Sequence, residues 1–233
     1  DGGMLVNTSE TTNMAHLIDT KTKEIVANIL VDSRPRYAEF KKDGSELWVS
    51  SEVGGTISVI DPKKRELKQK ISFEVPGMSK EAIQPIGISL TKDGKRAFVA
   101  LGPANRVAVI DAESKKIEKY LLVGQRVWHL AFTPDEKYLL TANGVSNDVS
   151  VIDVAALKVI KNAETLLQAG IPIVGEPTAD ELKALEEGSS PVIQIVSFVP
   201  LASIDPLFYD KAYLLAPDKR DRKSTRLNSS HTD

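Results

Sequence analysis

The sequence predicts a mainly β fold, namely an incomplete β-propeller of about three and a half four-stranded blades, followed by a short helix and a small β-hairpin. The first observation is a short apolar segment ending in aspartate, which recurs as Ala15–Asp19, Ile57–Asp61, Val107–Asp111 and Val149–Asp153. The second is spacing, because successive copies lie 42, 50 and 42 residues apart. The third is another aspartate series in the same phase, Asp43, Asp93 and Asp135. Repeats of about 40–45 residues with several strands are typical of propeller blades.

The recurring segment is interpreted as a buried strand, because its apolar residues alternate and many are β-branched. The closing residues Asp19, Asp61, Asp111 and Asp153 are interpreted as structural turn residues. An aspartate carboxylate can accept hydrogen bonds from backbone N–H groups two residues on, which stabilises a turn. Recurrence in every repeat favours this structural role over a catalytic one.

Asp-Gly dipeptides are expected to turn the chain between the first two strands of a unit. Gly44 and Gly94 supply the positive φ that a tight hairpin needs. Glu136 stands at the same position of the next unit, so a different turn type is expected there. The longest interval contains eight extra residues, and these are assigned to Glu74–Pro85, where Pro and Gly break strands.

The units follow one another along the chain. Residues 4–31 are expected to hold the last hairpin of an incomplete blade, with strands near Met4–Asn7 and Met14–Ile18. Three full units are then expected at Tyr37–Ile71, Gly87–Leu121 and Val127–Ile160. In the second of these, the strands are placed near Ile86–Leu90, Arg96–Leu101, Arg106–Ile110 and Lys116–Leu122. The period stops after Asn162.

The repeats resemble the YVTN-type β-propeller family over residues 1–161. The residues that carry the resemblance are Leu47–Val49, Gly54–Asp61, Tyr138–Asn143 and Asp148–Asp153, which agree in phase. Val127–Phe132 and Asn143–Asp148 resemble more narrowly the propellers associated with quinoprotein (PQQ-dependent) alcohol catabolism. This resemblance implies a periplasmic accessory role without catalysis.

A different pattern follows the repeats. Thr178 and Glu181 have capping-box spacing, which predicts a helix over Ala179–Glu187, and strands are expected at Val192–Val199 and Leu207–Leu215. Residues 176–219 resemble the bacterial form of the Ku family, a DNA-end-binding protein. The matching segments are Asp180–Leu185, Val192–Ile195, Phe198–Val199 and Ile204–Asp218. Ala212 stands where that family usually has proline, and Leu214 where an aromatic residue is common.

Three segments are therefore expected: a propeller fragment at 1–161, a Ku-like fragment at 162–219, and a disordered tail at 220–233 that resembles a translated sequencing adapter. A joined chimera is the expected origin. The opening Asp1–Met4 is interpreted as the middle of a hairpin whose natural start lies upstream. The location is expected to be periplasmic if the propeller resemblance holds and an export signal was lost, and cytoplasmic if the Ku resemblance holds.

Composition excludes several classes of protein. The chain has 233 residues, a net charge of −2 and 27% charged residues, which are ordinary for a soluble protein. Neither nucleic-acid nor membrane binding is indicated, and no run of about 18 apolar residues predicts a spanning helix. Cysteine is absent, which excludes disulfides and thiolate metal sites.

Few side chains are candidates for binding a ligand, a metal or a phosphate. Trp128 and His129 are the candidate ligand-facing residues, although the structural interpretation, a strand-edge aromatic and a loop-facing imidazole, is favoured. His16 and His231 are isolated, so no metal site is expected. Gly54, Gly55 and Gly144 precede no helix and are therefore not phosphate loops. We expect a binding protein that is no enzyme and holds no cofactor, with a protein or small molecule as ligand of the propeller.

The Ku resemblance implies DNA ends and a ligase as partners, and a role in non-homologous end joining, for a complete Ku protein. Residues 164–218 contain nine acidic and two basic residues, a net charge of −7. Phosphate contacts from Lys and Arg supply most nonspecific affinity for DNA. The segment by itself is therefore not expected to bind DNA ends.

Overall fold

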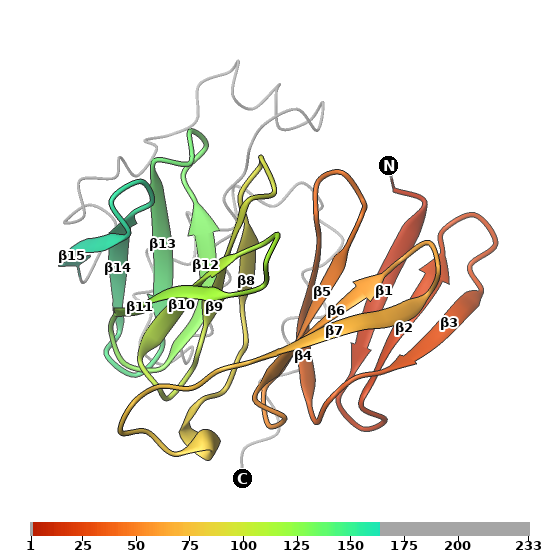
Figure 1. Ribbon diagram of the computed structural model, residues 1–233, viewed down its shortest axis with the longest axis horizontal. Coiled ribbons are helices and arrows are strands. Elements are labelled where there is room, and N and C mark those ends of the chain that lie inside the picture. Colours follow the sequence, from red (N-terminus) through yellow and green to blue (C-terminus); the bar gives the residue numbers. More distant parts are fainter. Residues whose placement is uncertain (1, 164–233) are drawn as a thin grey trace, which may run out of the picture. The chain divides into compact units, whose positions relative to one another are not determined.

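The computed structural model describes residues 2–163 (Figure 1). Their strands form four antiparallel sheets that follow one another along the chain, and each strand pairs with its sequence neighbours. The first sheet contains β1 (Met4–Ser9), β2 (Met14–Asp19) and β3 (Ile25–Leu30). The second contains β4 (Pro35–Phe40), β5 (Leu47–Ser51), β6 (Thr56–Asp61) and β7 (Glu66–Ser72).

The third and fourth sheets repeat this four-stranded plan. The third contains β8 (Ile88–Leu90), β9 (Arg96–Ala100), β10 (Arg106–Asp111) and β11 (Ile117–Leu122). The fourth contains β12 (Val127–Phe132), β13 (Tyr138–Asn143), β14 (Asp148–Asp153) and β15 (Lys158–Ala163). The prediction of a mainly β, blade-like fold is confirmed. The helix and strands expected between Ala179 and Leu215, and the tail at 220–233, lie outside the described residues.

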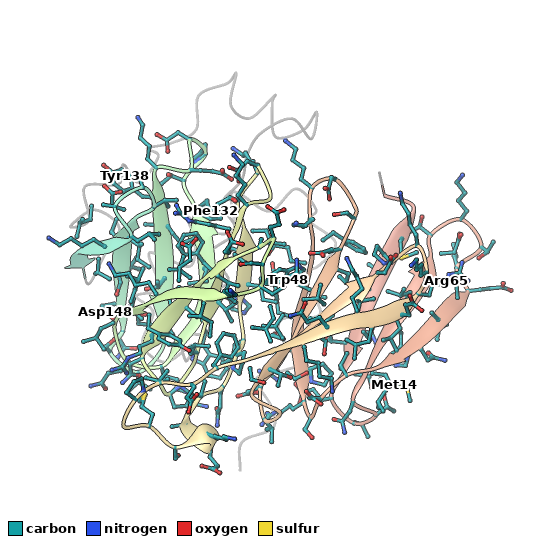
Figure 2. The ribbon with its side chains drawn as sticks, in the orientation of Figure 1. Met14, Trp48, Arg65, Phe132, Tyr138 and Asp148 are labelled. Carbon is teal, nitrogen blue, oxygen red and sulfur yellow. The ribbon has the colours of Figure 1, made fainter. Side chains whose placement is uncertain are left out.

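Each sheet buries one face against the next sheet. Between the first and second, Leu17 and Ile29 pack with Leu47, Val49 and Ile60. Between the second and third, the core contains Trp48, which is fully buried (Figure 2). Between the third and fourth, the rings of Phe98 and Phe132 meet edge to face, with centroids 5.6 Å apart. A fully buried large apolar side chain contributes about 1.5–3 kcal/mol, so these junctions hold the sheets together.

The recurring aspartates lie at turns. The Oδ1 atom of Asp19 accepts hydrogen bonds from the N–H groups of Lys21 and Thr22, at 2.8 and 2.9 Å. Asp61, Asp111 and Asp153 repeat this pattern with the residues two or three positions on. Backbone hydrogen bonds lower the pKa of Asp19, Asp61 and Asp111, which keeps these turns intact in mild acid.

The expectation of a different turn at Glu136 is wrong. Glu136 has a φ of 55°, close to the 69° of both Gly44 and Gly94. Its N–H donates to the carbonyl three residues back at 2.8 Å, as theirs do. Hydrogen bonds hold this residue in the left-handed region, since the Glu136 carboxylate accepts from the N–H of Lys92 at 3.0 Å. A glutamate therefore tolerates the conformation that glycine adopts freely.

The eight extra residues lie in the connection between β7 and β8, where the sequence placed them. This connection contains a short 3₁₀ helix, η1 (Lys80–Ala82). Val75, Ile83 and Ile86 are buried, so the longer connection packs as part of the core between the second and third sheets.

Candidate functional site

The innermost strands of three sheets converge. β8 contacts both β4 and β12. Tyr37, Gly87 and His129 occupy equivalent positions of the three repeats, and the rings of Tyr37 and His129 meet nearly edge-on with centroids 5.6 Å apart. A Cβ atom on Gly87 would lie 2.7 Å from the carbonyl oxygen of Trp128. Only glycine therefore fits at this position, directly before β8, where its N–H donates to that oxygen at 3.0 Å.

A carboxylate links the second sheet to the third at this place. Oε1 of Glu39, on β4, accepts a hydrogen bond from the N–H of Leu90 at 3.0 Å. Burial raises the pKa of Glu39 to about 7, and the bond from Leu90 opposes this only in part. Burial, together with the positive charge of Arg36, lowers the pKa of His129, so this imidazole is neutral near pH 7.

Two arginines and two glutamates form an ion-pair network beside these rings. Nε of Arg34 lies 3.2 Å from Glu10 and 3.3 Å from Glu52, and Nε of Arg36 lies 3.3 Å from Glu52. Arg36 also pairs with Glu10. The Glu52 side chain is only 4% exposed, so its charge is held inside the protein by both guanidinium groups. The network joins the β1–β2 and β5–β6 turns to the start of β4.

Asparagine side chains hold the entry to two of the inner strands. The N–H of Arg34 donates to Oδ1 of Asn13 at 3.1 Å, and the N–H of Arg126 donates to Oδ1 of Asn105 at 2.8 Å. Both arginines have positive φ, 59° and 54°. The asparagine bonds therefore stabilise a backbone conformation that an arginine rarely adopts.

Trp128 and His129 face different surroundings. The Arg126 guanidinium carbon lies 4.9 Å from the centroid of the Trp128 ring, within cation–π range. A Cβ atom on Gly144 would lie 2.4 Å from Nε1 of Trp128, so the indole packs directly on the β13–β14 turn. Trp128 remains partly exposed, whereas His129 turns toward Tyr37.

A small apolar pocket, with a volume of about 20 Å³, lies on the fourth sheet. Its lining residues come from β12, β13 and β14 and are His129, Leu130, Ala131, Leu140, Thr141, Ala142 and Val149. Of the two residues that the sequence singled out, His129 is thus at this pocket and Trp128 at the turn. Over residues 2–163 no group of His, Asp and Glu side chains is arranged to hold a metal ion. No helix in that part of the chain is long and apolar enough to span a membrane.

Sequence reasoning missed most of the cluster. Tyr37, Glu39, Arg36 and the pair of glutamates were not singled out. Aligning the repeats gives one usable signal, because the position of His129 is Tyr37 in one unit and glycine in another. Tyr37 and His129 are aromatic at this position, and Gly87 is the equivalent residue in the repeat between them. This pattern indicates that the two rings meet across the glycine.

The chain matches two protein families in different parts. Residues 18–173 match the family described as lactonase, seven-bladed β-propeller. The chain belongs to this family. The match runs from β2 to beyond β15 and therefore covers the repeats that build the site. Residues 168–229 match the Ku70/Ku80 β-barrel domain.

Solved structures share the fold of these repeats. Kuenenia stuttgartiensis hydrazine synthase has a TM-score of 0.64 at 22% identity, and the match covers 70% of this chain and 46% of that one. A functionally unknown protein from Desulfotomaculum acetoxidans has a TM-score of 0.59 at 15% identity, covering 70% and 53%. At these identities the likeness shows the fold alone.

The Ku match also appears among curated proteins. The non-homologous end joining protein Ku of Paraburkholderia phymatum is 65% identical over 46 residues, 20% of this chain and 15% of that protein. The protein of the same name from Mycobacterium tuberculosis is 40% identical over 47 residues, 20% of this chain and 17% of that protein. The chain therefore spans less than a fifth of these relatives.

Proposed function

We propose that the propeller part of this chain is a non-enzymatic binding scaffold of the YVTN type that accompanies quinoproteins. The ligand, a protein or small molecule, would contact the loops at the ends of the inner strands. The observation that carries this is the partly exposed Trp128, on which the Arg126 guanidinium stacks. Trp and Arg side chains dominate the energetics of protein interfaces.

The non-enzymatic character is supported by the partners of the two titratable groups. His129 meets the ring of Tyr37, and Glu39 accepts from the backbone N–H of Leu90. Neither is bonded to a hydroxyl that it could activate as a nucleophile for covalent catalysis. The proposal therefore assigns His129 and Glu39 to shape and stability.

Binding is tested by biolayer interferometry against a purified PQQ-dependent alcohol dehydrogenase. We expect Trp128→Ala combined with Arg126→Ala to weaken binding at least tenfold. Lys64→Ala is the matched control, because Lys64 is 70% exposed in a turn far along the sequence from this cluster. Absence of binding by the unchanged chain, or an equal loss in the control, contradicts the proposal.

Enzymatic activity is tested separately, with D-glucono-δ-lactone as the probe and proton release as the signal. We expect no hydrolysis above the spontaneous rate. Hydrolysis that His129→Ala or Glu39→Gln abolishes while the fold is retained would overturn the non-enzymatic proposal and replace it with lactone hydrolysis at the inner strands.

A second candidate function rests on the Ku match. A complete Ku containing residues 168–229 would bind DNA double-strand ends in non-homologous end joining and recruit a ligase. We propose in addition that the two parts have separate origins, a chimera, because the two family matches meet at residues 168–173. Single long reads of the source DNA across the codons for residues 155–170 test this. One read carrying both parts in frame rejects it.

A further inference from the structure

We propose that Arg126 and Trp128 form a binding site for a carboxylate, and that an aspartate or glutamate side chain of a protein partner occupies it. This inference rests on the proposed binding function and names the chemical group that the ligand presents. Within residues 2–163 the Arg126 guanidinium forms no ion pair and its side chain donates no hydrogen bond. A partly buried guanidinium has lost hydration, which only the ring of Trp128 replaces here.

The equivalent arginine of the second sheet does have carboxylate partners. Arg34 lies 92 residues before Arg126, has a similar positive φ, and is held by an asparagine side chain in the same way. Nε of Arg34 lies 3.2 Å from Glu10 and 3.3 Å from Glu52. At this position of the repeat, the protein itself therefore uses carboxylates to neutralise the guanidinium.

Both carboxylates are absent from the equivalent place in the third and fourth sheets. The residues 92 positions after Glu10 and Glu52 are Gly102 and Gly144. These glycines lie in the β9–β10 and β13–β14 turns, which belong to sheets with all four strands present in the described residues. A Cβ atom on Gly144 would lie 2.4 Å from Nε1 of Trp128, so the indole occupies the space that the equivalent glutamate side chain would need.

The other tryptophan of the chain shows how a cation on an indole ring is completed by a carboxylate. The Lys115 ammonium lies over Trp48, 5.1 Å from the ring centroid. Oε2 of Glu46 accepts from Nζ of Lys115 at 2.6 Å and from Nε1 of Trp48 at 3.1 Å. One carboxylate thus accepts from both the cation and the indole N–H.

Arg126 and Trp128 present the same two kinds of donor without the acceptor. The guanidinium carbon lies 4.9 Å from the ring centroid, and Nε1 of Trp128 donates to no residue within 2–163. A guanidinium binds a carboxylate through two parallel N–H···O bonds, and charge-assisted bonds of this kind are about twice as strong as neutral ones. An external carboxylate would therefore complete this pair as Glu46 completes the pair at Trp48.

The surroundings of the pair favour a protein side chain over a small molecule. The indole packs on the β13–β14 turn, which carries Val145, 55% exposed. The apolar pocket of the fourth sheet is lined by His129 but by neither Arg126 nor Trp128. Sites for small molecules are usually concave, whereas Trp and Arg are enriched at the centres of protein interfaces. The group that fits is therefore an aspartate or glutamate side chain on the surface of a protein.

NMR spectroscopy of the full chain tests the site, with acetyl-glutamate amide as the probe and acetyl-glutamine amide as its uncharged isostere. The chain has two tryptophans, so two indole N–H signals are expected, and Trp128→Phe identifies one of them. We expect the glutamate probe to shift the Trp128 signal in a saturable way and the glutamine probe to leave it unchanged. The signal of the fully buried Trp48 should not move. Equal shifts with both probes, or no shift, would overturn the proposal.

Arg126→Gln should weaken binding of the glutamate probe by about tenfold, because the charge-assisted hydrogen bonds are lost. Arg65→Gln is the matched control, since Arg65 also has a positive φ and its side chain donates only to a backbone carbonyl among the described residues. An equal loss in both variants contradicts the assignment. Because the probe is titrated into the chain alone, this result is independent of whether a PQQ-dependent alcohol dehydrogenase binds, so the two proposals can fail separately.

Exchanging side chains between the repeats tests the site without a probe. Gly144→Glu alone should lower the melting temperature, because the new Cβ meets the indole of Trp128. Adding Trp128→Arg copies Arg36 and Glu52, so that Arg126 gains a carboxylate partner within the chain. The double variant should therefore melt at a higher temperature than the single one. A double variant that melts no higher than Gly144→Glu would show that the two places are not equivalent and would remove the basis of the proposal.

Discussion

At the scale of single residues, the buried carboxylate of Glu46 helps to join the second and third sheets. Glu46 is 6% exposed. Its Oε2 accepts from Nζ of Lys115 at 2.6 Å and from Nε1 of Trp48 at 3.1 Å, and its Oε1 accepts from Lys68 at 2.9 Å. Burial raises the pKa of Glu46, but hydrogen bonds from Lys115, Lys68 and Trp48 outweigh it and lower the pKa to about 2.

Replacing Glu46 should therefore cost much stability. We expect Glu46→Ala to lower the free energy of unfolding by about 3 kcal/mol, because Lys115 is left buried and unpaired. Since the folded pKa lies below the ordinary 4.5, the wild-type contribution is present above pH 4.5 and is lost as pH falls toward 2. Urea unfolding between pH 2 and 7 measures both effects. Glu66→Ala, whose partner Lys64 is exposed, should change stability by less than about 0.5 kcal/mol.

Glu39 should act in the opposite direction and in another pH window. Its folded pKa of about 7 exceeds 4.5, so the folded state holds a proton that the unfolded chain has lost between these values. This contribution to stability is present below pH 4.5 and disappears as pH rises through 7. We expect Glu39→Gln to raise stability at pH 8 by about 1–3 kcal/mol. Thermal melts at pH 5 and 8 measure this, and an equal gain at both values would contradict the assignment.

At the scale of one element, equivalent buried polar side chains are hydrogen-bonded in the fourth sheet but lack hydrogen-bond partners in the second. In the fourth sheet, Nδ2 of Asn143 donates to Asp148 at 2.9 Å and to Oγ of Ser150 at 3.0 Å. The equivalents in the second sheet are Ser51 and Ser58, and both hydroxyl groups are buried without a hydrogen-bond partner. The shorter serine does not reach the group that the asparagine amide bonds.

Ser51→Asn should repair this position. The amide would reach Oγ of Ser58, and we expect a gain of about 1 kcal/mol from satisfying buried polar groups. The reverse change, Asn143→Ser, should cost a similar or larger amount in the fourth sheet. The denaturant midpoints of both variants, compared with that of the unchanged chain, measure these changes in stability. A loss of stability in Ser51→Asn would mean that the site has no room for the amide.

Strand positions could be predicted from the sequence, whereas the site could not. Alternation and the repeat period place strands such as β6 and β14 within about a residue of their observed bounds, because burial on one face enforces that pattern. The turn at Glu136 was mispredicted, since its conformation depends on a hydrogen bond to Lys92 of another sheet. The Tyr37–His129 contact depends likewise on the meeting of separate sheets, which no local pattern encodes.

At the scale of the whole molecule, the Ku match suggests DNA binding, whereas the charge of the matching segment opposes it. Residues 164–218 carry a net charge of −7, and phosphate binding requires the reverse sign. The basic residues Lys219, Arg220, Arg222, Lys223 and Arg226 are concentrated after that segment. Any affinity for DNA should therefore come from the basic end of the chain.

We expect this chain not to discriminate DNA ends from internal duplex. A gel shift with linear and closed-circular DNA at about physiological salt measures it, and weak binding should disappear as salt rises, because it rests on phosphate contacts. Deleting residues 219–233 should abolish the remaining binding. A preference for linear DNA that survives this deletion would restore end binding as a function of the chain.

The asparagine hydrogen bonds at the inner strands fix the number of residues between the asparagine and the arginine that it bonds. Asn13 and Arg34 are 21 residues apart, and so are Asn105 and Arg126. The hairpin between each pair can change its side chains freely, but an inserted or deleted residue would pull donor and acceptor out of register. The second sheet has Gly55 at the position of these asparagines, and glycine has no side chain to accept the equivalent hydrogen bond. Changes in length should thus be tolerated least between Asn13 and Arg34 and between Asn105 and Arg126.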